Sequence, residues 1–523
     1  MATENPLASL ILGRCSDDHL VSLAYNPSGI GIKEFLEDKN FLITGGIGFL
    51  AKILIEMILR MNPDVGKIYI LIKVAGSELF RCMKETHGKD YHSFLAEKLV
   101  PVIGDVREAN LGIAPDLAYK IADEVDIIVN SALSIYQYDV AMDINTLGAF
   151  RIMSFAQRFR RLKLLLHVST AYVSGQRQGV VMEKPFQLGD TIAKEFGGST
   201  DCKVAALLDI ETEVKLALAS RIGSDDSASI SQEMKRLGLE RANLWLARCL
   251  CVFQGHGGDG RQLHARRYTG GHHQAEHHRK HPKGPLPRMM DPLILSYGSG
   301  QATSCLADPD CVIDVIPADM VVNVMLASMA KHGQLRQGQL TRGMHVCHVS
   351  SSTANPMLCK DLFGFFFQHF TRSPFMDVAG LPILVQPMHF CGDMEELSTP
   401  ATWRTRCCRP PPPGRPRFLR GRSATSMPRL WRESSTAPDS TSPTPSTAAG
   451  LKMATRTSLF AEMSAEEREK FHFNVRSVDW MNYITDMHIL GLMKYVGKGK
   501  AFVRAQIMVM FMRGMVGLAL LSS

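Results

Sequence analysis

The sequence predicts an α/β fold built on a doubly wound parallel sheet, followed by a smaller, mostly helical domain. Apolar segments of strand length alternate with helix-forming segments throughout residues 41–173. The first of these strands ends at a glycine-rich turn, and a helix begins directly after that turn. Such alternation is typical of parallel sheets covered by helices, in which ligands bind at the carboxyl ends of the strands.

The glycine-rich turn lies between an apolar strand at residues 41–43 and a helix at residues 49–61 that contains neither Gly nor Pro. Gly45, Gly48 and Ala51 follow one another at intervals of three residues. In a nucleotide-binding turn, the first glycine permits a tight bend and the second lets a pyrophosphate approach the backbone. The small third residue lets the helix pack closely on its strand. A glycine turn in another kind of α/β protein is the alternative.

A cation follows the second predicted strand, because the apolar run at residues 67–72 ends at Lys73. Folds that select NAD place an Asp or Glu at this point to hold the ribose 2′-hydroxyl, whereas a cation suits the 2′-phosphate of NADP. Lys73 therefore favours NADP, and a solvated lysine without a ligand is the alternative.

Three later strands, at residues 99–106, 126–132 and 162–173, bring polar residues to the same edge. The last of them delivers Ser169 and Thr170, which we predict to be catalytic; hydrogen bonding of these hydroxyls within their own turn is the alternative. The predicted cofactor site along this edge consists of Thr44, Gly45, Gly48, Phe49, Ala51, Lys73, Asp105, Val106, Asn130, Ala132 and Asn145.

Composition narrows the class of protein. At 523 residues, with 45% hydrophobic and 21% charged residues, the chain suits two globular domains. No signal peptide is evident, and the 12 cysteines include no Cys-x-x-Cys, which favours a reduced, intracellular compartment. Residues 255–288 hold seven Arg or Lys against two acids, and residues 404–432 hold nine Arg against none. These segments contribute charges of +5 and +9 to the net +8, so the rest of the chain has a charge of −6. We therefore predict no nucleic-acid partner.

Five segments resemble the fatty acyl-CoA reductases, specifically the plant male-sterility type. They occur in the family's order, at residues 44–52, 101–105, 138–145, 167–173 and 308–320. The resemblance implies an extended short-chain dehydrogenase. Its domains would be an N-terminal arm at 1–36, a Rossmann-like NADP-binding reductase domain at 37–343, and a C-terminal domain at 344–403 and 451–523.

The resemblance also implies the reaction, in which NADPH reduces a fatty acyl thioester of CoA or acyl carrier protein to a primary alcohol for wax or sporopollenin precursors. The glycine-rich turn would cradle the pyrophosphate, and Lys73 would replace the family's arginine at the 2′-phosphate. Asp105 would bind the adenine. Thr170, with Ser169 beside it, would polarise the substrate carbonyl. The loop at residues 130–138 is shorter than the family's loop, which puts the nicotinamide end of the site in doubt.

The chain departs from the family after residue 242, where a catalytic helix should carry Tyr-x-x-x-Lys. That spacing lets the lysine lower the tyrosine's pKa, so that the phenol can donate a proton to the carbonyl oxygen. Residues 243–288 contain no such pair and are rich in Gly, His and Arg. We predict that 247–288 is a disordered insert and that catalysis is impaired, with Tyr268 the first candidate for a substitute donor. A metal site of its histidines and cysteines is the alternative, and we predict no metal.

Two other segments are atypical. Residues 404–450 are rich in Arg and Pro and are predicted to be disordered. Out-of-frame translation or a misplaced exon boundary would produce blocks such as this one and 247–288. The apolar run at 507–521 is shorter than the roughly 20 residues that span a bilayer, so we predict a core helix or a peripheral contact with a membrane.

The leading hypothesis is an NADPH-dependent fatty acyl-CoA reductase in the cytosol or at the endoplasmic reticulum surface. A plastid location stays open, although no clear transit peptide is visible. One alternative is an extended short-chain dehydrogenase acting on sugar nucleotides or steroids. Another is a catalytically impaired relative that retains only nucleotide binding. The oligomeric state is left open.

Overall fold

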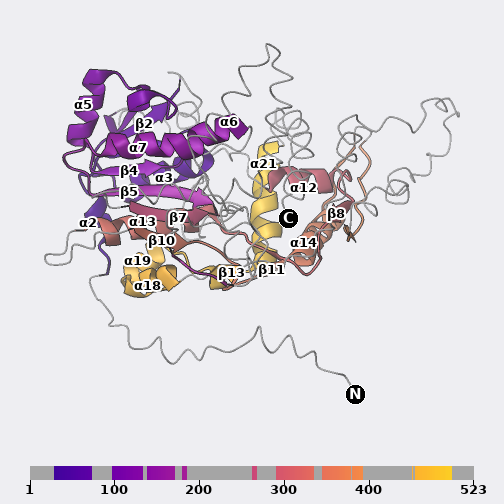
Figure 1. Ribbon diagram of the computed structural model, residues 1–523. Helices are drawn as coiled ribbons and strands as arrows, with labels where there is room; N and C mark the ends of the chain where they lie inside the picture. Colours follow the sequence, from indigo (N-terminus) through magenta and orange to yellow (C-terminus); the bar gives the residue numbers. More distant parts are fainter. Residues whose placement is uncertain are drawn as a thin grey trace, which may run out of the picture.

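A computed structural model describes residues 29–73, 97–132, 138–170, 180–184, 262–267, 290–334, 344–377, 380–392, 450–451 and 454–496. Several predicted features lie outside these residues: most of the N-terminal arm, Tyr268, the apolar run at 507–521, and nearly all of 247–288 and 404–450. The helices and strands are shown in Figure 1.

The main sheet has seven strands, all parallel, in the order β10-β7-β5-β4-β1-β2-β3. The strands are β1 (Phe41–Thr44), β2 (Ile68–Ile72), β3 (Leu99–Ile103), β4 (Ile127–Asn130), β5 (Leu164–Thr170), β7 (Gln262–Arg267) and β10 (Met344–His348). Strand order reverses at β1, which is the arrangement of a doubly wound sheet. The predicted fold class is therefore confirmed.

Successive residues of β1 pack into two different cores because strand side chains alternate between faces. Phe41 and Ile43 belong to the core on the face covered by α3 (Phe49–Met61) and α13 (Ala318–Gly333). Leu42 belongs to the core on the opposite face, which α5 (Pro115–Glu124) and α7 (Gly148–Ala156) cover. All four residues of β1 are buried, as expected for a central strand of a two-sided sheet.

The insert predicted to be disordered at 247–288 contains β7, which lies between β5 and β10. Its backbone pairs in parallel with both neighbours, from Leu165↔Gln262 to Thr170↔Arg267 on one side and from Met344↔Gln262 to His348↔Arg266 on the other. These six residues are therefore described as a strand, and disorder of the rest of the insert stays a prediction. Ladder hydrogen bonds use main-chain groups, so a segment without apolar periodicity can still pair between two strands.

The remaining described helices are α2 (Ile32–Leu36), η2 (Ala109–Gly112), α6 (Tyr138–Ala141), η3 (Met142–Leu147), α12 (Asp291–Gly298), α14 (Cys359–Arg372), α18 (Ala454–Glu462), α19 (Ala465–Lys470), η6 (Val475–Ser477), α20 (Trp480–Asn482), η7 (Tyr483–Ile489) and α21 (Leu490–Val496). Short strands form three two-stranded sheets: β8 (Ser304–Leu306) with β12 (His389–Cys391), β9 (Val312–Ile313) with β11 (Met357–Leu358), and β6 (Val180–Val181) with β13 (Gly450–Leu451).

The C-terminal helices pack in two places. Near α12 and α14, η7 leads into α21 (Figure 1), and His488 Nε2 of η7 lies 2.9 Å from the carboxylate of Asp291 at the start of α12. Helix α19 lies against the start of the described chain, where Glu467 accepts hydrogen bonds from backbone N–H groups of α2 and the residues before it.

The sheet itself continues to His348 in β10, beyond residue 343, where the sequence placed the end of the reductase domain. Within the described chain, no helix is both long and apolar enough to cross a membrane.

Candidate functional site

The glycine-rich turn leaves no room for side chains at two positions. Gly45 has φ +66°, and a Cβ there would lie 2.6 Å from the carbonyl oxygen of Ser131 after β4. A Cβ on Gly46 would lie 2.1 Å from Ile70 Cγ2 of β2. The turn is closed by the Gly48 N–H, which donates to the Gly45 carbonyl at 2.8 Å. The backbone between β1 and α3 is therefore packed tightly against β2 and the end of β4.

Helix α3 begins at Phe49 with Gly48 as its N-cap. Its first turn contains Ala51, which is fully buried against the core, and no acidic residue. Gly48 provides no side-chain cap to this helix. A helix N-terminus of this kind favours an anion, because the macrodipole and the first N–H groups both point toward it.

Asn130, at the end of β4, connects three neighbouring strands through its side chain. Thr44 Oγ1 donates to Asn130 Oδ1 at 2.7 Å, and the Ala132 N–H donates to the same oxygen at 3.2 Å. The Asn130 amide nitrogen lies 2.9 Å from His167 Nδ1 on β5. The side chains of Thr44, Asn130 and His167 are all buried. Thr44, Asn130 and Ala132 were predicted to contact the cofactor, and here they fix the strand ends beside the glycine-rich turn.

Burial lowers the pKa of His167 to about 4, so its ring is neutral near pH 7. With Nδ1 accepting from the Asn130 amide, the ring proton belongs on Nε2. This tautomer in turn directs Asn130 Oδ1 toward Thr44. In the sequence, His167 is the first residue of the motif at 167–173, and no periodicity indicates this contact.

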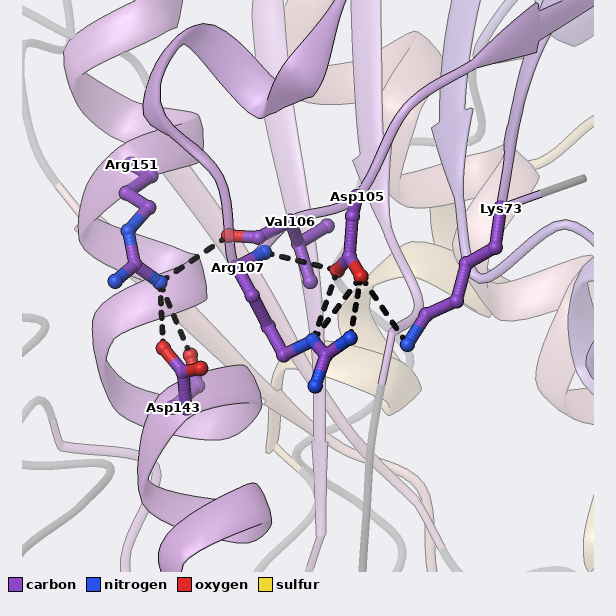
Figure 2. Close-up of polar contacts among 6 residues, drawn as sticks. All are labelled: Lys73, Asp105, Val106, Arg107, Asp143 and Arg151. Atoms are coloured by element: carbon purple, nitrogen blue, oxygen red, sulfur yellow. Dashed lines mark hydrogen bonds and ion pairs between the residues drawn. The ribbon is translucent and has the colours of Figure 1, made fainter. Parts of the chain in front are cut away.

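A compact group of charges lies at the ends of β2 and β3 (Figure 2). Lys73 Nζ is 3.2 Å from Asp105 Oδ2, and Arg107 contacts the same oxygen through Nη2 at 2.8 Å and Nε at 3.0 Å. The Arg107 N–H also donates to Asp105 Oδ1 at 3.0 Å. Burial alone would raise the pKa of Asp105, but the hydrogen bonds from Arg107 and the contact with Lys73 bring it down to about 2. The two cations and one carboxylate carry a net charge of +1.

The loop after β3 positions Asp105 through a stretch of backbone with positive φ angles. Asn110 and Leu111 have φ values of 50° and 60°, and Gly112 follows with φ +61°. A non-glycine residue in this region costs roughly 1–2 kcal/mol. Leu111 is fully buried in the core of that face, and its carbonyl accepts from the Asp105 N–H at 2.8 Å. Burial of Leu111 offsets the conformational cost and fixes the position of Asp105.

Two further polar residues continue the edge from α7 and η3. Arg151 Nη1 is 2.8 Å from Asp143 Oδ1 and 3.4 Å from the carbonyl oxygen of Val106 (Figure 2). Val106 itself is buried, so at this site it contributes its backbone. Asn145, predicted to contact the cofactor, lies in η3 and is half-buried. Arg107 and Arg151 were not predicted from the sequence. Arg107 contacts the predicted residue Asp105, and Arg151 contacts the carbonyl of the predicted residue Val106.

The predicted catalytic hydroxyls lie at the end of β5. Ser169 is buried, and Thr170 is the last residue of the strand, beside Arg267 of β7 in the backbone register. The strand register pairs Asn130 with His167, three residues before Thr170, so β5 ends on the same edge as the glycine-rich turn but extends beyond β4.

A Tyr-x-x-x-Lys spacing does occur elsewhere, at Tyr69 in β2 and Lys73 directly after that strand. Four residues along a strand span roughly 13 Å, so the two side chains cannot act as the pair that a helix would present. The Tyr69 hydroxyl instead donates to Glu124 at 2.7 Å, and burial raises its pKa well above the usual range. Among the described residues, no group of ligating side chains is arranged to hold a metal ion.

The chain is similar to known proteins over most of its length. An NAD-binding family model described as "Male sterility protein" matches residues 43–242. The "Fatty acyl-CoA reductase 2, chloroplastic" of Arabidopsis thaliana is 39% identical over 511 residues, covering 90% of this chain and 80% of the relative. This chain belongs to the fatty acyl-CoA reductase family. The "Alcohol-forming fatty acyl-CoA reductase" of Simmondsia chinensis is 33% identical, with coverage of 68% and 75%.

Membership confirms the family predicted from the five motifs. It also gives the chain an NAD(P)-binding domain of the extended short-chain dehydrogenase type, for a nicotinamide cofactor. Among solved structures, the reductase domain of a non-ribosomal peptide synthetase from Mycobacterium tuberculosis aligns with a TM-score of 0.45 at 16% identity, covering 91% of this chain and 96% of that one.

Proposed function

We propose that the chain binds NADPH along the carboxyl edge of the main sheet and reduces a fatty acyl thioester to a primary alcohol. The names of the two plant relatives support the substrate and the product. The cofactor assignment rests on one observation, the group formed by Lys73, Asp105 and Arg107. Its net positive charge lies after β2 and β3, where the adenosine end of a dinucleotide binds in this fold.

The residues of the edge fit a dinucleotide. A Cβ on Gly45 or Gly46 would fill the turn, and the N-terminus of α3 carries neither an acid in its first turn nor a side-chain cap. These features leave backbone N–H groups for a pyrophosphate. Lys73 and Arg107 would hold a 2′-phosphate between them. Asp105 is already engaged by both cations, so it would orient them as well as accept a hydrogen bond from adenine.

Reduction of the thioester to the alcohol would take two hydrides, one from each of two NADPH molecules, with release of the carrier thiol after the first. The protein must stabilise the negative charge that develops on the carbonyl oxygen, and we assign this hydrogen bond to Thr170, with Ser169 as its neighbour. A hydroxyl of this type is a poor acid. Residues 243–288 offer no Tyr-x-x-x-Lys, so we expect turnover roughly 10²–10⁴ below that of a chain with a proton donor.

The missing pair also favours a second candidate function, a family member that retains nucleotide binding with very little turnover. The two candidates share the cofactor site and differ in the product formed. We place the chain inside the cell, with the chloroplast favoured by the name of the Arabidopsis relative. Imaging of a C-terminal fluorescent fusion checks the compartment.

The test offers purified protein NADPH with a long-chain acyl-CoA, the same acyl group on acyl carrier protein, a sugar nucleotide or a steroid. Fatty aldehyde or alcohol from the thioesters alone is the expected result, and a comparison of the two thioesters identifies the carrier. Saturable NADPH binding with no product supports the second candidate. Conversion of the sugar nucleotide or the steroid instead would overturn both.

A further inference from the structure

Four cysteines from separate segments lie near one another around the start of α14. Cys305 lies in β8, Cys391 in β12, Cys311 directly before β9, and Cys359 directly after β11. All four are free thiols, and Cys359 and Cys391 are buried. Cys305 and Cys311 are partly exposed.

Backbone register places two of these thiols opposite each other. Strands β9 and β11 are antiparallel, with Met357 facing Ile313 and Leu358 facing Val312. The next pair along the ladder is Cys359 and Cys311, and the Cys359 N–H donates to the Cys311 carbonyl at 2.9 Å. Residues directly opposite in such a ladder have Cα atoms roughly 4.5–5.5 Å apart and side chains on one face. A disulfide requires a Cα separation of about 4.4–6.8 Å.

Register argues against the other neighbouring pair. Strands β8 and β12 are parallel, with Phe390 beside Cys305 and Cys391 beside Leu306. Successive residues of a strand point to opposite faces, so Cys305 and Cys391 lie on opposite sides of this small sheet. The geometry therefore singles out Cys311 and Cys359.

The two thiols differ in reactivity. A hydrogen bond from the Cys359 thiol lowers the pKa of Cys311, which is the more exposed of the two. The same hydrogen bond, together with burial, raises the pKa of Cys359. Cys311 therefore has the character of an attacking thiolate, because the thiolate is the nucleophile in exchange with a disulfide. Cys359, the first residue of α14, has the character of a resolving thiol.

We propose that Cys311 and Cys359 form a reversible disulfide by exchange with a low-molecular-weight disulfide. The Cys311 thiolate attacks one sulfur of that disulfide, which releases one small thiol and leaves a mixed disulfide on Cys311. The hydrogen bond that kept the Cys359 proton in place is then lost. Cys359 gives up its proton to solvent and attacks the Cys311 sulfur, which releases the second small thiol. Two protein thiols are oxidised and the external disulfide is reduced to two thiols.

The surrounding contacts already hold both cysteines in place. The Lys360 N–H donates to the Pro309 carbonyl at 2.9 Å, and Lys360 Nζ is 2.5 Å from Asp310 Oδ1. These bonds fix the turn before Cys311 against the first turn of α14, so the disulfide would form with little backbone movement. It would join β9 covalently to α14.

The test incubates the full chain with oxidised glutathione, blocks remaining thiols, and maps disulfides by mass spectrometry after non-reducing digestion. The expected product is a peptide pair linked through Cys311 and Cys359, which dithiothreitol removes. Cys359→Ser should trap glutathione on Cys311. Cys391→Ser, the matched control at a buried neighbouring thiol, should leave the link unchanged. A wild-type chain whose other thiols take up glutathione, but which shows no link between these two peptides, would overturn the proposal. So would a Cys359→Ser chain without glutathione on Cys311.

Discussion

The guanidinium of Arg107 and the carboxylate of Asp105 form a two-point contact across a single intervening residue, with Nη2 at 2.8 Å and Nε at 3.0 Å from Oδ2. Lys73 reaches the same oxygen from β2. A carboxylate shared by two cations cannot present a free negative charge to a ribose. The arrangement therefore suits a phosphorylated ribose, and this relationship underlies the predicted cofactor preference.

The first prediction concerns this preference. NADPH should bind about ten- to a hundredfold more tightly than NADH, because one charged contact with a phosphate contributes roughly 1–3 kcal/mol. Lys73→Glu and Arg107→Gln should each reduce the preference. Calorimetric titration of both nucleotides measures it. Lys67→Glu changes the same residue type at the other end of β2 and should leave the preference intact. Equal affinities in the wild type would reject the assignment.

The second prediction concerns the glycine-rich turn. Gly45→Ala should destabilise the fold by about 2–4 kcal/mol, because the residue has a positive φ and its Cβ would meet the Ser131 carbonyl at 2.6 Å. It should also weaken NADPH binding. Gly364→Ala in α14 is the matched control, since nothing lies within 4 Å of its Cβ position. That variant should be neutral or gain about 0.5–1 kcal/mol. Denaturant unfolding compares them, and equal effects would contradict the account of the turn.

The third prediction concerns the buried His167. Its native pKa of about 4 lies below the unfolded value near 6.5, so between these pH values the unfolded chain binds a proton that the native chain does not. Stability should therefore fall as pH drops from about 6.5 to 4, by up to about 3 kcal/mol from this residue. His167→Gln removes the titrating group and should make the slope of unfolding free energy against pH shallower by one proton. An unchanged slope would show that His167 is not neutral in the folded chain.

The fourth prediction concerns the contact between the two ends of the described chain. Glu467 accepts backbone hydrogen bonds from Ile30, Gly31 and Ile32 at 2.8–3.0 Å. Glu467→Ala should cost about 2–4 kcal/mol, because these three N–H groups and the Ser464 N–H lose a charged acceptor. Glu466→Ala, at the neighbouring carboxylate whose side chain is 69% exposed, should leave the stability nearly unchanged. Thermal unfolding of both variants checks this. Similar losses of stability in the two variants would argue against a stabilising role for the hydrogen bonds to Glu467.

Much of the sheet could be predicted from the sequence because buried parallel strands leave continuous apolar runs that end in recognisable turns. The segments around Phe41 and Ile68 show this clearly, and their carboxyl ends lie on the predicted edge. Strand β7 could not be predicted, because its place depends on backbone pairing with β5 and β10 and leaves no apolar pattern in its own residues.

The polar contacts of the site were harder to foresee. Arg107 resembles an ordinary surface cation in the sequence, and its partner Asp105 is held by the Leu111 carbonyl in a left-handed stretch of backbone. Leu111 gives no local signal for that conformation, which its tertiary burial stabilises. Asn130 was correctly placed at a strand end, but its partner His167 is set by the register between β4 and β5.

The most direct test of the account follows deuterium from the 4-position of labelled NADPH into product while long-chain acyl-CoA is supplied in excess. We propose that the cofactor site is intact and that an efficient proton donor is missing. We therefore expect saturable NADPH binding and deuterium at C1 of the alcohol, formed roughly 10²–10⁴ times more slowly than the about 10 s⁻¹ typical of enzymes. Turnover at that typical rate would contradict it, because another residue, with Tyr268 the first to mutate, would then supply the proton.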